Sequence, residues 1–179
     1  MRADRYIALE PLDLNWSGAA KRLRKDTKDD FWHDPLRYDD LLAPSFLNQP
    51  DIRNRLADFY PRQATSWSIP KSGGDTRHSI QLPFLDRIVY QALTDKLINP
   101  LDSCLGTSVF SYRANVPHSP YMFKSDAGGW QALENTVRER IASNPSGYVV
   151  VGDYSRYFEN IGLGPLSEQL DNLWSCPRI

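Results

Sequence analysis

A carboxylate stands directly after the most apolar run of the chain. The run Tyr148–Val151 is followed by Gly152 and Asp153. A continuous apolar run of this length predicts a strand buried on both faces. A carboxylate at the end of such a strand is costly unless water or a cation neutralises it. Asp153 is therefore either a solvated residue that caps the next turn or a ligand of Mg²⁺, with the backbone carbonyl of Tyr154 as a further oxygen ligand.

Two basic residues flank a pair of glycines in the middle of the chain. Lys71 and Arg77 stand on either side of Gly73 and Gly74. The segments 64–69 and 77–82 are rich in β-branched and aromatic residues and roughly alternate, which predicts a β-hairpin. On paired strands the ammonium and the planar guanidinium can point toward one ligand. The alternative is a basic hairpin tip without a ligand.

The other expected elements are mostly helices. Apolar spacing and cap residues predict helices over 16–28, 36–42, 51–59, 85–99, 130–141 and 163–173. Asp51 is expected to be the N-cap of the third of these helices. Helix breaks are expected at Ala43-Pro44, Asn99-Pro100 and Gly128-Gly129. The order of hairpin, helices, buried strand and final helix predicts an α+β fold.

Composition excludes several classes of protein. The chain has 179 residues, of which 41% are hydrophobic and 24% charged, as in ordinary globular domains. The net charge of −1 excludes a basic field over the whole molecule, although residues 61–124 carry +3 and residues 125–179 carry −3. No apolar run approaches the length of a membrane span, and the N-terminus lacks the apolar region of a secretory signal. Two cysteines cannot build a disulfide scaffold, so a reducing cytoplasm is the expected location.

Four segments, in order, resemble motifs of reverse transcriptases of the group II intron, retron and other bacterial types. Residues 153–161 (DYSRYFENI) resemble the first catalytic palm motif, Asp-hydrophobic-x-x-Phe-Phe-Asp-x-Ile. Residues 69–77 resemble the fingers hairpin I-P-K-x-G-G-x-x-R, and residues 83–93 resemble the helix P-x-x-D-R-I-V-x-x-A-L. Residues 108–113 resemble the S-x-G-[FY]-R segment, with Ser111 where glycine is usual. The resemblance spans residues 61–175.

The resemblance implies the fingers and a partial palm of a right-hand polymerase. The expected regions are a helical N-terminal region over 1–60, the fingers over 61–146 and the beginning of the palm over 147–179. The second palm motif of the family, Tyr-x-Asp-Asp, does not occur, and the chain ends 26 residues after Asp153. We therefore expect a front portion that is inactive alone, with a protein partner supplying or completing the palm.

The resemblance also implies an activity and a set of ligands. The activity is Mg²⁺-dependent addition of dNTP to a DNA or RNA primer on an RNA template. Asp153 would be the catalytic carboxylate and would bind Mg²⁺ together with Tyr154. Arg113 would contact the template, and its alternative is a structural salt bridge.

The implied dNTP site combines the hairpin with the palm motif. Lys71 and Arg77 would bind the triphosphate, and Tyr154 would lie beside the nucleotide. The ring of Phe158 would pack under the sugar and exclude a 2′-hydroxyl.

Other functions remain open. The chain could be a non-catalytic nucleic-acid-binding remnant of a reverse transcriptase, or a protein-interaction module in antiviral defence against phage. Residues 29–42 are similar to lead-in segments of defence-associated reverse transcriptases. The alternative for this segment is an ordinary helical subdomain packed with Trp32 and Leu41.

Overall fold

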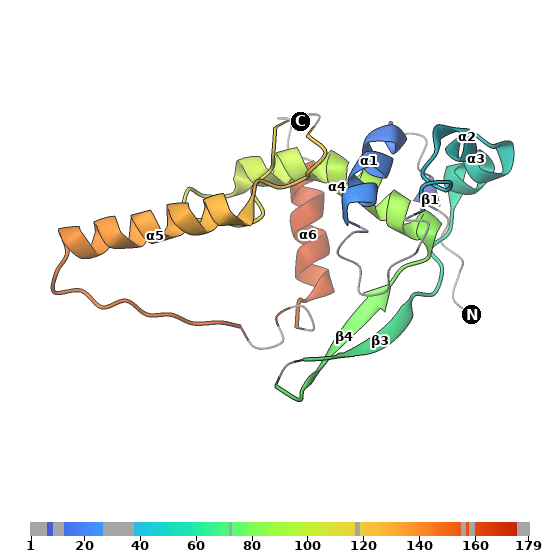
Figure 1. The fold of residues 1–179 in the computed structure, drawn as a ribbon. Coiled ribbons are helices and arrows are strands. Elements are labelled where there is room, and N and C mark those ends of the chain that lie inside the picture. Colours follow the sequence, from blue (N-terminus) through green and yellow to red (C-terminus); the bar gives the residue numbers. More distant parts are fainter. Residues whose placement is uncertain are drawn as a thin grey trace. The chain divides into compact units, whose positions relative to one another are not determined.

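The computed structural model describes residues 7–8, 13–26, 38–71, 73–116, 119–154, 157 and 160–174. These residues form six α-helices and two small two-stranded antiparallel sheets (Figure 1). The predicted α+β class is therefore confirmed, whereas the arrangement of a right-hand polymerase stays a prediction. The chain divides into two compact units. The first comprises Met1–Leu97 and Val116–Met122, and the second comprises Ile98–Asn115 and Phe123–Ile179.

The first unit contains most of the short elements. Its helices are α1 (Trp16–Asp26), α2 (Pro44–Leu47), α3 (Pro50–Ala57) and most of α4 (Phe84–Cys104). Strand β1 (Ile7–Ala8) pairs with β2 (Asp58–Phe59), a pairing that the sequence did not predict. Strands β3 (Thr65–Pro70) and β4 (Thr76–Gln81) form the predicted hairpin, with Ile69 opposite Arg77.

The core of the first unit lies between α1, α3 and α4. Ala19, Ala20 and Leu23 of α1 cluster with Ile88 and Ala92 of α4. A second cluster joins α3 and β2 to α4 through the side chains of Ile52, Leu56, Phe59 and Val89. Burial of a large aliphatic side chain contributes about 1.5–3 kcal/mol. The apolar spacing that predicted α1 and α4 therefore corresponds to real buried faces.

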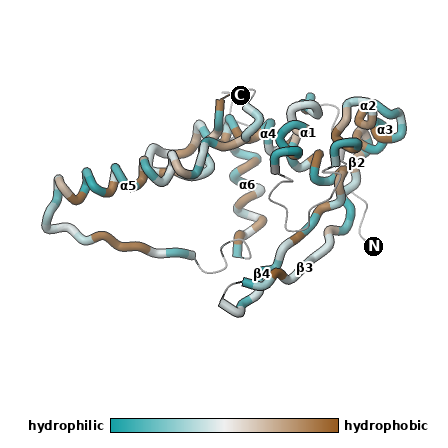
Figure 2. Tube along the Cα trace, in the orientation of Figure 1, coloured by the Kyte–Doolittle hydropathy of each residue, from teal (hydrophilic) through white to brown (hydrophobic). Residues whose placement is uncertain are grey.

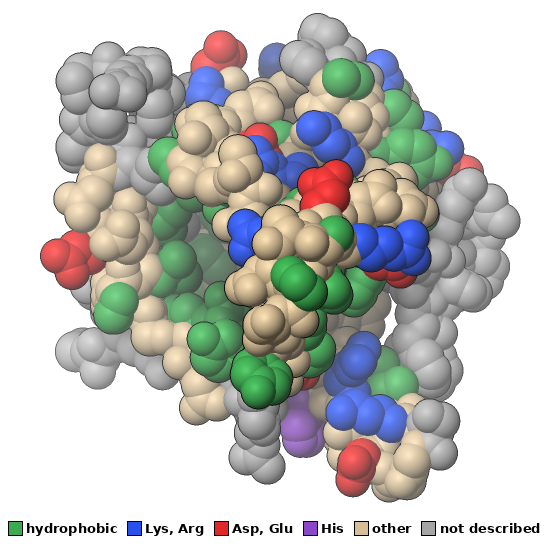
Figure 3. Space-filling model, turned by 90° about the vertical axis from the view of Figure 1, so that its left-hand side faces the viewer, with side chains coloured by type: hydrophobic (Ala, Val, Ile, Leu, Met, Phe, Trp, Pro, Cys, Tyr) green, Lys and Arg blue, Asp and Glu red, His purple; other side chains and the backbone are tan. Residues whose placement is uncertain are grey.

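The second unit has helices without a comparable core. It contains the C-terminal end of α4, then α5 (Asp126–Ser143) and α6 (Leu163–Trp174), and an isolated bridge between Ala114 and Phe123. Among the residues described in this unit, no side chain is buried. Hydrophobic side chains lie open on the molecular surface among charged ones on the face seen in Figure 3.

The prediction for the segment Tyr148–Val151 is wrong. A strand buried on both faces was predicted, but these residues form no strand, and Tyr148, Val150 and Val151 are 97%, 89% and 92% exposed. Figure 2 shows this hydrophobic run in the extended segment after α5. A strand is buried on both faces only when neighbouring strands and helices cover it. The described residues of this unit form no other strand that could do so.

Two proline positions have different outcomes. The break predicted at Ala43-Pro44 is present: Ala43 is the extended N-cap of α2, and Pro44 is its first residue, where a missing backbone N–H has no cost. Pro100 was expected to end α4, but the helix continues through it to Cys104. Interior proline disrupts one helical hydrogen bond. Here it does so only four residues before the helix ends.

Helix starts were partly mispredicted as well. Gln49, not Asp51, is the N-cap of α3, and Asp51 lies in the first turn, where a carboxylate is favourable to the helix dipole. Helix α5 begins before Gly128-Gly129 because the hydroxyl of its N-cap, Ser125, accepts a hydrogen bond from the Gly128 N–H at 3.3 Å. A Cβ at Gly129 would lie 2.6 Å from the Phe110 carbonyl oxygen, so this approach requires glycine.

Residues 38–42 form turns instead of the predicted helix over 36–42. Leu42 of this segment is buried in the first core cluster. Trp32 and the rest of residues 27–37 lie outside the described residues. In the part of the chain that the structure covers, every helix is too short or too polar to cross a membrane.

Candidate functional site: a basic hairpin tip and an exposed carboxylate

The tip of the β3–β4 hairpin is closed by backbone hydrogen bonds. The Lys71 N–H donates to the Asp75 carbonyl at 2.7 Å, and the Gly74 N–H donates to the Lys71 carbonyl at 3.1 Å. Gly74 has a φ of +86°, which lies in the left-handed region that favours glycine. Added Cβ atoms at Gly73 and Gly74 would contact nothing within 4 Å. The tip is therefore a defined turn with open space around its backbone.

Strand register places Lys71 and Arg77 on one face of the hairpin. Arg77 is opposite Ile69, and Lys71 is two residues beyond Ile69 and bonded to Asp75. Because side chains alternate along a strand, Arg77 and the position of Lys71, one residue beyond the end of β3, fall on the face of Ile69 as diagonal neighbours, whose backbones typically lie about 7–8 Å apart. Both are exposed, and neither is ion-paired with a carboxylate in the described part of the chain. The sequence prediction that they can face one ligand is consistent with this geometry.

The predicted catalytic carboxylate lies in the second unit. Asp153 and Tyr154 are both exposed, Tyr154 by 81%. The ring of Tyr154 lies 6.2 Å from that of Tyr157, which is 55% exposed. Phe158, the predicted contact of the nucleotide sugar, lies outside the described residues. The structure therefore describes the carboxylate and the hairpin cations in separate units.

The residues around Asp153 satisfy only part of a magnesium site. Mg²⁺ accepts one or two protein carboxylates when waters and substrate phosphates complete its octahedron. Asp153 offers one accessible carboxylate, and the Tyr154 carbonyl follows it in the chain. Within the residues covered by the structure, no group of three or more His, Cys, Asp or Glu side chains could hold a metal ion. Asp153 thus fits as a single ligand and not as a complete site.

Arg113, the predicted template contact, is bound within its own unit. Its Nε and Nη2 atoms donate to the two carboxylate oxygens of Asp102 at 2.9 and 3.1 Å. Its Nη1 donates to the carbonyl of Gly106 at 3.0 Å, and the Ala114 N–H donates to Asp102 at 2.8 Å. The hydrogen bond from Ala114 and those from Arg113 lower the pKa of Asp102 below 3.8. The salt-bridge alternative therefore describes Arg113 in this structure, and a template contact stays a prediction.

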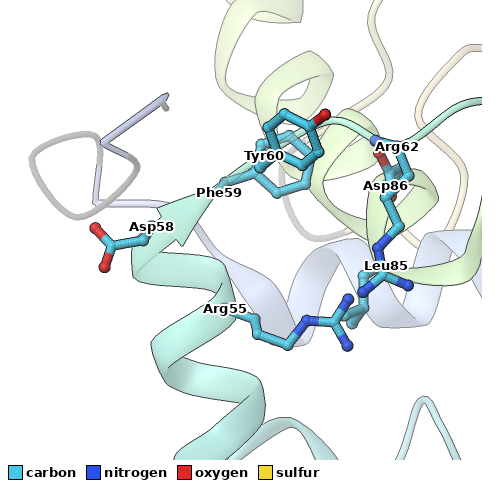
Figure 4. A pocket seen from close by; sticks show the side chains of 7 residues that line it. All are labelled: Arg55, Asp58, Phe59, Tyr60, Arg62, Leu85 and Asp86. Atoms are coloured by element: carbon cyan, nitrogen blue, oxygen red, sulfur yellow. Dashed lines mark hydrogen bonds between the residues drawn. The ribbon is translucent and has the colours of Figure 1, made fainter. Parts of the chain in front are cut away.

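Sequence reasoning missed a second pair of basic residues. Arg55 of α3 and Arg62, which follows β2, line one cavity of about 100 Å³ (Figure 4). The cavity also has walls from Phe59, Tyr60 and Leu85. No motif marks these arginines, because they are seven residues apart and separated by the end of a helix. Only the turn from α3 into β2 brings them to the same cavity.

Comparisons with known proteins give no further guide. No family model, curated protein or solved structure matches this chain. A functional proposal therefore rests on the geometry of the hairpin and of Asp153 and on the four motif-like segments.

Proposed function

We propose that this chain is a segment of an RNA-directed DNA polymerase, in which the β3–β4 hairpin binds the triphosphate of an incoming dNTP. The observation that carries the proposal is the common face of Lys71 and Arg77 at a glycine-containing tip. Two exposed cations on one face, without carboxylate partners in the described residues, suit a polyanionic ligand. The order of the four motif-like segments supports the same class.

Lys71, Arg77 and Asp153 would each bind a different part of the ligand or its metal ion. The Lys71 ammonium would act as a point charge on the phosphates, and the Arg77 guanidinium would grip two phosphate oxygens at once. Asp153 would hold Mg²⁺ together with ligands from outside the described residues, and bound Mg²⁺ would neutralise charge on the triphosphate. Because the 179 residues contain no Tyr-x-Asp-Asp sequence, we expect incorporation only when further palm residues are supplied in cis or in trans.

The test is dNTP binding by variants of the two hairpin faces. Lys71→Ala and Arg77→Ala should each weaken binding at least about tenfold, since a charge-assisted hydrogen bond is lost. His78→Gln is the matched control because His78 is next to Arg77 but on the opposite face of the hairpin. Equal binding by all three variants and the unmodified chain would contradict the proposal. Fluorescence anisotropy with a labelled dNTP measures the effect.

A second candidate is nucleic-acid binding without chemistry. The solitary position of Asp153 among the described residues favours it, because one carboxylate neutralises two closely spaced metal ions poorly. Incorporation on primed RNA, measured with a palm segment supplied, separates the two. Loss of incorporation on Asp153→Ala supports the polymerase, whereas salt-dependent RNA binding without any incorporation supports the binding module.

A further inference from the structure

A cavity at the base of the hairpin brings two guanidinium groups together. The side chains of Arg55 and Arg62 reach toward each other from α3 and from the segment after β2, beside Leu85 (Figure 4). Both arginines are exposed. Among the residues that the structure describes, no carboxylate forms an ion pair with either guanidinium. Two cations that converge without a counter-ion repel each other, so an anion between them would stabilise the arrangement.

The acidic residues at the cavity do not supply that anion. Asp58 lines the cavity, but its carboxylate points away from the two guanidinium groups (Figure 4). Asp86 is 6% exposed, and its Oδ1 accepts a hydrogen bond from the Arg62 backbone N–H at 2.8 Å. This bond holds the backbone of Arg62 in place beside α4. Asp86 therefore positions one arginine of the pair, and although two aspartates balance the two arginines in formal charge, neither carboxylate is ion-paired with a guanidinium group of the described residues.

The size of the cavity selects a small anion. A volume of about 100 Å³ is well below the 300–1,000 Å³ of pockets that enclose drug-sized molecules. It has room for one phosphate group and not for a nucleoside. Two guanidinium forks suit a small oxyanion such as phosphate, because each fork can donate two parallel N–H groups to two oxygens.

The surroundings favour a phosphate that belongs to a strand. Tyr60 lines the same cavity and is 49% exposed, so its ring offers a surface on which a base can stack. Strand β3 begins three residues after Arg62 and leads to the Lys71 and Arg77 tip. Basic groups interleaved with an aromatic ring are typical of sites that follow a single-stranded nucleic acid.

We propose that Arg55 and Arg62 bind a backbone phosphate of single-stranded RNA at the base of the hairpin, with Tyr60 beside it. The choice of RNA rests on the proposed function, but the site is separate from the dNTP contacts at the tip. Binding is therefore measured in EDTA and without dNTP, so that failure of this site and failure of the polymerase proposal are distinguishable.

The experiment compares Arg55→Gln, Arg62→Gln, the double variant that combines them and one control variant of the full chain by anisotropy of a short labelled RNA. Arg55→Gln and Arg62→Gln should each weaken binding about fivefold. The double variant should lower the slope of log affinity against log salt by about 0.7, the value for one single-strand phosphate. Arg53→Gln is the matched control, because Arg53 is exposed on the same helix but lines a different cavity. Circular dichroism checks that all variants are folded.

Two results would overturn the inference. Arg55→Gln and Arg62→Gln could bind RNA as tightly as Arg53→Gln, in which case the cavity holds no strand. Alternatively, inorganic phosphate could bind the unmodified chain with loss on the double variant while RNA binding is unaffected, which would make this a site for a free anion. A double lysine variant, Arg55→Lys with Arg62→Lys, keeps both positive charges. If it retains RNA binding while the glutamine variants lose it, the phosphate contact is supported.

Discussion

The two units of this chain treat their hydrophobic residues in opposite ways. In the first unit, Ile88 and Val89 of α4 are 0% and 1% exposed, and two clusters surround them. In the second unit, Trp130 of α5 is 65% exposed and Leu163 of α6 is 77% exposed. Both units show helical spacing of apolar residues. The comparison teaches that spacing identifies the face of a helix that is suited to burial, but burial itself depends on a partner within reach.

The largest expected effect comes from removing a buried side chain of the first unit. Ile88→Ala should lower the free energy of unfolding by about 2–5 kcal/mol, because a fully buried isoleucine leaves a cavity. Ile141→Ala is the matched substitution in the second unit, where the side chain is 49% exposed, and should cost less than about 1 kcal/mol. Denaturant unfolding followed by circular dichroism measures both. Similar costs for the two variants would break the distinction between the units.

A smaller, local effect is expected at the ion pair of the second unit. Because hydrogen bonds lower the pKa of Asp102 in the folded state, its stabilising contribution is complete above its ordinary pKa of 3.8. The contribution should be lost as the pH falls below 3.8 and through the folded-state pKa. The amide resonance of Ala114, which donates to Asp102, should therefore shift over this acid range in an NMR titration.

Asp102→Asn supplies the comparison for that titration. The amide keeps the shape of the side chain but removes the charge that Arg113 contacts and the group that titrates. The acid-range shift of Ala114 should disappear in this variant. If the shift persists, another group near the 102–115 segment is responsible, and the ion pair is not what orders this part of the second unit.

Much of the first unit and of the hairpin could be predicted from sequence, because local rules determine them. Apolar spacing gave α1 and α4, and alternation with a Gly-Gly turn gave β3 and β4. The common face of Lys71 and Arg77 follows from the same alternation once the turn is closed. These features need no knowledge of distant residues.

Features that depend on distant or irregular contacts could not be predicted in this way. Asp102 pairs with Arg113 across an irregular loop, and Arg55 and Arg62 line one cavity only because of the turn from α3 into β2. The run Tyr148–Val151 has the composition of a buried strand, but composition does not supply the neighbouring strands. Pro100 shows the reverse case, in which local chemistry predicts a break that the surrounding helix tolerates.

The smallest effect on stability is expected in the exposed apolar run Tyr148–Val151 of the second unit. Val150→Ser with Val151→Ser should change the free energy of unfolding by no more than about 0.5 kcal/mol, because both side chains are already in water. The same substitutions should lower aggregation, measured by light scattering against concentration, since an exposed apolar segment promotes pairing between chains. A large loss of stability would mean that these valines are buried in solution. In that case the second unit would have a core formed by this segment, and the two units would no longer differ in kind.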